Sequence, residues 1–141
     1  MTAQPPRSQR DGRLDGPSFA VLLFLLALPA FALSRLAPGI DWRVLAGIPV
    51  AISLFTFLSY RSDKRRAEAG EWRIPEASLH LAELAGGWPG AFLAQRNYRH
   101  KTAKLSFQVV FWLIVLLHQF AALDFLLGWK LTTGLLQLFK A

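Results

Sequence analysis

The chain has 141 residues, of which 53% are hydrophobic and none is cysteine, and its formal net charge is +7. This length leaves room for one domain, and the absence of cysteine excludes disulfides and thiolate-based metal or catalytic sites. The hydrophobic residues gather in uncharged runs at 18–34, 44–60 and 105–123. We therefore expect an integral membrane protein, whose positive charge reflects the cytoplasmic side of a membrane rather than a nucleic-acid partner.

The N-terminal part divides into a polar tail and a first membrane span. Residues 1–16 are rich in Gln, Pro, Arg and Asp, so we expect a disordered tail. A membrane domain is predicted over residues 17–128, with its first span at about 18–36 and Pro29 inside that helix. The stretch 30–32 resembles a signal-peptidase site, but two later spans favour an uncleaved first helix.

Two further spans are predicted from the remaining apolar runs. The second covers about 43–60, with Asp41 as candidate N-cap. The third covers about 106–128, with Ser106 as candidate N-cap. A helix of about 20 apolar residues crosses a bilayer core of about 30 Å, and both runs approach that length. Residues 129–141 alternate leucine pairs with lysines, which predicts an interfacial C-terminal tail.

A polar, glycine-broken motif block lies between the second and third spans, at residues 61–105. It holds 9 of the 16 Lys and Arg residues and 5 of the 9 carboxylates, so we expect any binding or chemistry to be here. Residues 75–99 read as a helix, a Gly86-Gly87 break and a second helix. This pattern favours an all-α membrane fold with three transmembrane helices and a re-entrant or interfacial helical hairpin. Four transmembrane helices, with 77–95 crossing, are the alternative.

The distribution of basic residues favours three spans and a cytoplasmic N-terminus. With three spans, 12 basic residues lie inside and 4 outside. If residues 77–95 also cross, the division becomes 10 against 6. Because cytoplasmic loops carry the excess of Lys and Arg, the first arrangement fits better.

One face of the first hairpin helix carries possible metal ligands. Glu76, His80 and Glu83 are spaced i, i+4, i+7, which places them on one helical face. Carboxylates and imidazole there are weak metal candidates, with His100 as an obvious fourth donor. The preferred interpretation is a polar face at the headgroups, with the carboxylates pairing arginines such as Arg73, Arg96 or Arg99. We therefore predict neither a metal nor a cofactor.

The third span carries amides at Gln108 and Gln119, eleven residues apart and thus nearly on one face. Such amides usually join helices. A proton or ligand path through the neighbouring His118 is the alternative.

The motif block resembles a bacterial membrane family catalogued as domain of unknown function 1294, over roughly residues 44–125. The resemblance rests on the order and spacing of Tyr60, Asp63-Lys64, Ala67, Gly70, Trp72-Arg73-Ile74-Pro75-Glu76, Leu79-His80, Gly86-Gly87-Trp88-Pro89-Gly90-Ala91, Gln95, Arg99-His100-Lys101-Thr102, Lys104, Ser106-Phe107 and Val110-Phe111-Trp112.

The resemblance implies an integral protein of the bacterial inner membrane. Many members of that family carry an N-terminal cold-shock domain, for which residues 1–16 are too short, so nucleic-acid binding is not expected here. The family pattern does not fix His80 and Glu83, and this counts against a metal site at these residues. Glu76 and His100 are left as the catalytic candidates.

Our leading hypothesis is a multi-pass inner-membrane protein whose cytoplasmic-side motif binds an anionic lipid headgroup or a phosphorylated partner. The expected anion-binding residues are Lys64, Arg73, Arg99, Lys101 and Lys104, and the expected structural residues are Asp63, Pro75, Gly86, Gly87 and Gly90. One rival is an intramembrane enzyme acting on a lipid or isoprenoid through Glu76 and His100. Another is an accessory or assembly subunit that packs on a membrane protein or a second copy. The sequence leaves enzymatic activity open, and the non-enzymatic interpretation is preferred.

Overall fold

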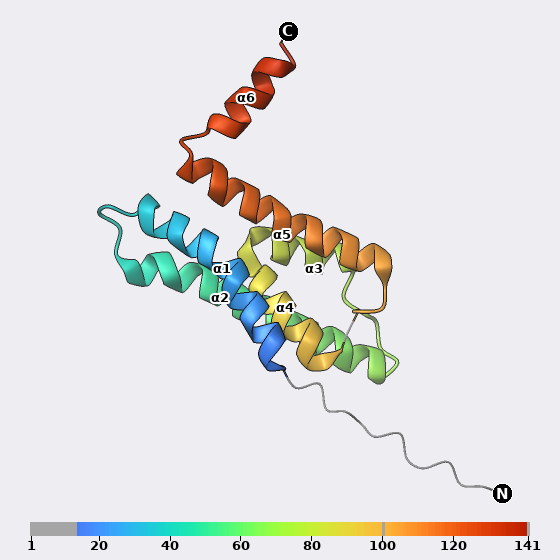
Figure 1. Cartoon of the computed structure of the whole chain (residues 1–141). Helices are drawn as coiled ribbons and strands as arrows, with labels where there is room; N and C mark the ends of the chain where they lie inside the picture. The colour runs from blue at the N-terminus through green and yellow to red at the C-terminus, as the bar shows by residue number, and fades with distance from the viewer. Residues whose placement is uncertain (1–13, 100, 141) are drawn as a thin grey trace, which may run out of the picture.

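The structure, a computed structural model, describes residues 14–99 and 101–140. Every regular element in this part of the chain is helical, and three helices are long and apolar enough to cross a membrane (Figure 1). The elements are α1 (Gly16–Leu36), α2 (Trp42–Glu68), α3 (Glu76–Ala82), the π-helical turn η1 (Glu83–Gly87), α4 (Trp88–Tyr98), α5 (Leu105–Leu126) and α6 (Lys130–Leu138). The prediction of an all-α membrane fold is confirmed.

Local capping sets where the long helices begin. The Asp41 carboxylate accepts a hydrogen bond from Arg43 N at 2.9 Å, which confirms the predicted N-cap of α2. The prediction of Ser106 as an N-cap was wrong, because α5 begins at Leu105 and its N-cap is Lys104. The Lys104 side chain is bonded to Glu76 at 2.8 Å, and this contact holds the chain at the start of the helix.

Helix α2 continues two turns beyond the apolar run that predicted it. It passes through the basic residues to Glu68 because the first break in the chain is Gly70, with φ +69°. Asp63 therefore lies on the same face of α2 as Tyr60, and both side chains are buried.

The α3–η1–α4 segment enters and leaves at the same end of α2. Ile74 N, just before α3, donates to Asp63 at 2.9 Å, and at the far end of α4 the Lys64 ammonium donates to the Tyr98 carbonyl at 2.7 Å. The break between them, where Gly86 has φ 112°, lies beside the middle of α2. The segment therefore folds back along α2, and we call it the re-entrant segment; neither α3 nor α4 is among the three helices that are long and apolar enough to cross a membrane.

Two glycines allow α4 and the break to lie directly on α2. A Cβ on Gly90 would stand 1.8 Å from the Ser53 carbonyl oxygen, and one on Gly87 would stand 1.9 Å from Thr56 Oγ1. Small residues at helix contacts are the usual way for backbones to approach in membranes. The predicted structural role of Gly87 and Gly90 thus has a direct steric basis.

Helix α5 is joined to its neighbours through its polar side chains. Gln108 donates to Gln95 of α4 at 2.8 Å, and Gln119 donates to the Leu25 carbonyl of α1 at 2.7 Å. The predicted interhelical role of both amides is confirmed. His118 is hydrogen-bonded to the Ile114 carbonyl of its own helix, and its ring lies beside the Trp88 ring.

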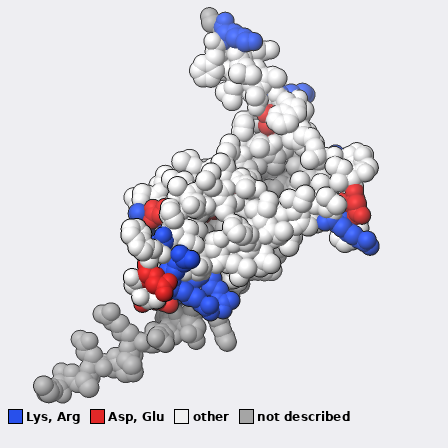
Figure 2. All heavy atoms as spheres, turned by 180° about the vertical axis from the view of Figure 1, so that it is seen from behind, with Lys and Arg blue, Asp and Glu red and all other residues white. Residues whose placement is uncertain are grey.

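The charged side chains gather at the two ends of the bundle. In the view of Figure 2 a broad uncharged surface separates a large mixed cluster, at the end that holds the C-terminus of α2, from a smaller group at the α1–α2 turn and from further charged side chains on and beside α6. This division is the one expected of a protein whose middle contacts lipid tails.

Candidate functional site

A buried carboxylate organises the charged end of the molecule. Asp63 is fully buried, and its oxygens receive Ile74 N at 2.9 Å, Arg73 Nη2 at 3.3 Å and Lys101 Nζ at 3.4 Å. These partners come from the segment before α3 and from the turn before α5. Asp63 therefore connects three separate parts of the motif block and compensates a nearly buried lysine.

Glu76 extends this cluster toward the surface. Its carboxylate lies 3.5 Å from Lys101 Nζ and 2.8 Å from Lys104 Nζ. The hydrogen bond from Lys104 holds the pKa of Glu76 below its usual value. The three ammonium and guanidinium groups thus face two carboxylates, which leaves an excess of one positive charge.

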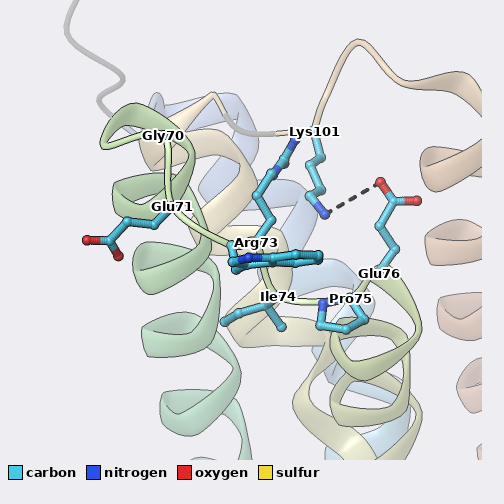
Figure 3. Close-up of a pocket in the computed structure, with 8 residues that line it drawn as sticks. Gly70, Glu71, Arg73, Ile74, Pro75, Glu76 and Lys101 are labelled. Carbon is cyan, nitrogen blue, oxygen red and sulfur yellow. Dashed lines mark ion pairs between the residues drawn. The ribbon is translucent and has the colours of Figure 1, made fainter.

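An open hollow of 630 Å³ lies beside this cluster. It is lined by the extended segment 70–76 and by Lys101. Figure 3 shows Lys101 reaching across to Glu76 above the floor formed by Ile74 and Pro75, while Glu71 points away. The Trp72 side chain at its edge is 90% exposed, in the position of an interfacial aromatic anchor.

A second polar group is buried about one helical turn nearer the N-terminus of α2, at Tyr60. The Tyr60 hydroxyl donates to Glu83 Oε1, and His80 Nδ1 lies 2.7 Å from Glu83 Oε2. Gln95 donates to the Tyr60 oxygen at 3.1 Å. Both oxygens of the buried Glu83 carboxylate therefore have a partner.

His80 is fixed in orientation by this group. Its ring lies 4.2 Å from the Phe107 ring, centroid to centroid. Lys101 Nζ lies 4.9 Å from the centroid of the same Phe107 ring. The His80 side chain is 16% exposed. The Glu83 carboxylate therefore fixes the orientation of the His80 ring.

The three proposed metal ligands do not come together. Glu76 faces Lys101 and Lys104, whereas His80 contacts Glu83, which also accepts a hydrogen bond from Tyr60. Within residues 14–99 and 101–140, no three His, Asp or Glu side chains are grouped to hold a metal ion. The expectation that the carboxylates pair arginines was wrong for both, because lysines, histidine and tyrosine occupy those positions.

Comparisons with known proteins identify the motif block. The sequence model of the family described as "Protein of unknown function (DUF1294)" matches residues 53–107. The uncharacterized protein YsdA of Bacillus subtilis (strain 168) is 37% identical over 65 residues, which cover 46% of this chain and 73% of that relative. The chain belongs to the DUF1294 family. No solved structure matches it.

The match places both polar groups of this DUF1294 protein within the family region. It begins at Ser53, which contacts Gly90, and ends at Phe107, which contacts His80. The matched region therefore contains the whole re-entrant segment and both buried carboxylates, Asp63 and Glu83.

The predicted anion-binding residues of the DUF1294 protein have different positions. Arg73 and Lys101 line the hollow, and Lys104 is paired to Glu76 at its rim. Lys64 holds the end of α4 through the Tyr98 carbonyl. Arg99 is exposed at the end of α4, in the left-handed conformation with φ 46°, and does not line the hollow.

Among the predicted catalytic residues, Glu76 is held in the lysine cluster, and His100 lies outside the described residues. Sequence reasoning did not predict the buried hydrogen bonds of Tyr60 and Gln95. The spacing of Tyr60 and Asp63, three residues apart on one helix, is the signal that both face the same side of α2.

Proposed function

We propose that this DUF1294 protein is a multi-pass protein of the bacterial inner membrane, with a cytoplasmic N-terminus, that binds the headgroup of an anionic phospholipid in the hollow at residues 70–76. The observation that carries the proposal is the placement of Arg73 and Lys101 in one open hollow, both held by the buried Asp63. Pre-oriented cations are the groups that recognise phosphate.

The electrostatics of the hollow support an anionic ligand. The Arg73 side chain is 51% exposed, so its guanidinium keeps donors for a phosphate oxygen while one contacts Asp63. The last turns of α2 add further exposed basic residues at Arg65 and Arg66. A cluster of cations beside a span attracts the anionic lipids of the cytoplasmic leaflet.

The position of the hollow favours a lipid over a free phosphorylated molecule. The exposed Trp72 lies at its edge, and indole rings prefer the headgroup level of a bilayer. The hollow also lies just beyond the C-terminus of α2, next to the start of the re-entrant segment. A lipid in the surrounding leaflet would place its phosphate there with its acyl chains along α2.

The test is lipid retention by the full-length protein. The protein would be purified from vesicles that contain phosphatidylglycerol and phosphatidylcholine, and the retained lipids quantified by native mass spectrometry. We expect phosphatidylglycerol to be enriched, and Arg73→Gln to reduce the enrichment several-fold, since one charge-assisted hydrogen bond is worth about 1.5–3 kcal/mol. Arg43→Gln, at the opposite end of α2, is the matched control and should retain lipid as the wild type does. Equal retention by Arg73→Gln and wild type would refute the proposal.

A further inference from the structure

The C-terminal helix α6 (Lys130–Leu138) follows α5 and stands outside the helix bundle. None of its residues is buried, and Figures 1 and 2 both show it projecting from the rest of the molecule. It also lies outside residues 53–107, which the family model matches. Neither the hollow nor the family match therefore accounts for this helix.

The residues of α6 divide into an apolar face and a polar face. Leu131, Leu135 and Leu138 are spaced i, i+4, i+7 and form one stripe, which Leu136 and Phe139 widen. The residues at i, i+3, i+7 and i+10 form the opposite stripe and are all polar: Lys130, Thr133, Gln137 and Lys140. Leu135 is 48% exposed and Leu138 is 75% exposed. A helix of this length is marginal in water, so its leucine face requires an apolar environment.

A buried carboxylate of α5 determines the direction of α6. Asp124 is 1% exposed and accepts hydrogen bonds from Leu131 N at 2.9 Å and from Thr132 N at 3.3 Å. The side chain of an N-cap residue ordinarily satisfies such amides of the first turn. The N-cap of α6 is Trp129, whose side chain makes no cap hydrogen bond. Helix α5 therefore supplies the cap of α6 and fixes the joint between the two helices.

The length of α5 places this joint at the surface of the membrane. Its 22 residues span about 33 Å at 1.5 Å per residue, against about 30 Å for the hydrocarbon core of a bilayer. The helix begins after Lys104, at the charged end of the bundle, and so reaches the opposite surface near Leu126. Trp129 is 54% exposed at that level, where indole rings gather. The leucine face of α6 therefore begins beside the lipid headgroups.

We propose that α6 is an interfacial helix that binds the lipid surface on the side of the membrane opposite the hollow. This develops the interfacial tail that the sequence predicts. The leucine face enters the boundary of the acyl chains, and Lys130 and Lys140 face the headgroups. Helices with leucine and aromatic residues on one face and lysines on the other lie in this plane.

The charge of the polar face favours lipid over a protein as the partner of α6. Within residues 14–99 and 101–140, neither Lys130 nor Lys140 pairs with a carboxylate. A layer of anionic headgroups compensates both lysines at once, while the acyl chains cover the leucines. No residue of the hollow takes part, so this inference stands independently of the proposed headgroup site.

The experiment uses the full-length protein in vesicles of phosphatidylglycerol and phosphatidylcholine. The chain contains no cysteine, so a spin label on a single introduced cysteine reports one position. Leu135→Cys and Leu138→Cys test the apolar face, and Thr133→Cys and Gln137→Cys are matched controls on the polar face. The measurement is the collision rate of each label with oxygen, which dissolves among the acyl chains, and with a water-soluble nickel chelate. We expect the oxygen-to-nickel ratio to be several-fold higher on the apolar face.

A charge placed on either face of α6 provides a second measurement. Leu135→Glu puts a carboxylate among the acyl chains and should lower the ratio of a label at Leu138→Cys several-fold. Gln137→Glu puts the same charge toward water and should leave that ratio unchanged, and equal effects of the two substitutions would overturn the proposal. Nickel access at all four labelled positions would place α6 in water. Protection of the apolar face from both reagents would place it against a protein, and either result would overturn the proposal.

Discussion

The Gln119 side chain of α5 donates a hydrogen bond at 2.7 Å to the backbone carbonyl of Leu25 in α1. In an uninterrupted helix that carbonyl would accept from the N–H of residue 29. Residue 29 is Pro29, which has no N–H, so the carbonyl lacks its normal donor within the helix. The amide of α5 thus replaces the hydrogen bond that proline removes, and it fixes α1 against α5 within the membrane.

This relationship predicts a measurable coupling between the two positions. Gln119→Leu should destabilise the protein by about 1 kcal/mol, because a carbonyl in the membrane loses its donor. Pro29→Ala restores the N–H of residue 29, so Gln119→Leu should cost little in that background. The measurement is a double-mutant cycle of unfolding in mixed micelles. Additive effects of the two substitutions would contradict the assignment.

The close contact of α4 with α2 predicts opposite effects for two glycine substitutions. Gly90→Ala should destabilise by about 1–3 kcal/mol or more, because the new Cβ would lie 1.8 Å from the Ser53 carbonyl oxygen and one backbone must move. Gly47→Ala is the control on α2 itself, since its Cβ would meet nothing within 4 Å. It should stabilise by about 0.5–1 kcal/mol through helix propensity. Thermal unfolding followed by tryptophan fluorescence distinguishes the two.

The Asp63–Lys101 pair predicts a large loss when only one partner is removed. The Lys101 side chain is 5% exposed, so Asp63→Asn leaves a nearly buried ammonium without its buried partner. We expect a loss of about 3–5 kcal/mol, and a partial recovery when Lys101→Met is added. Glu71→Gln, an exposed carboxylate that lines the same hollow, should be neutral. Unfolding free energies of these three variants and the wild type test this, and an equal effect of Glu71→Gln would argue against it.

The lowered pKa of Glu76 predicts a limited dependence of stability on pH. Its pKa in the folded protein is lowered by the Lys104 hydrogen bond, so its contribution is present above the unfolded pKa of about 4.3 and is lost as the pH falls through the folded value. Because the Glu76 side chain is 37% exposed, solvent screening limits the effect to about 0.5 kcal/mol. Stability curves from pH 7 to pH 3 should differ between wild type and Glu76→Gln, and the difference should shrink at high salt. Persistence of the difference in 1 M salt would contradict a screened surface pair.

The re-entrant topology predicts that both ends of the motif block face the same compartment. The chain contains no cysteine, so single-cysteine variants report position directly. Asn97→Cys, near the end of α4, should be labelled only from the cytoplasm, and Ile40→Cys, in the α1–α2 turn, only from the periplasm. An impermeant maleimide applied to intact cells tests both. Periplasmic labelling at position 97 would require 77–95 to cross the membrane.

The local features of the fold could be predicted because they depend on neighbouring residues. The apolar runs predicted the three long helices, Asp41 predicted the N-cap of α2, and Gly86 predicted the break between α3 and α4. Run length, short-range hydrogen bonds and backbone sterics are all properties of a few consecutive residues. The error at Ser106 has a different origin, because the N-cap residue Lys104 is held by a long-range contact with Glu76.

The partners of the charged and polar side chains were decided only by the tertiary structure. Helical spacing placed Glu76, His80 and Glu83 on one face, yet the turn before α5 supplied lysines to Glu76 while α2 supplied Tyr60 to Glu83. A sequence determines which residues share a helical face, but the elements that pack against that face determine which charges are compensated. In this protein the sequence alone determined three helices long and apolar enough to cross a membrane and a helical segment broken at Gly86, and packing decided that a lysine cluster and an oriented histidine lie one turn apart.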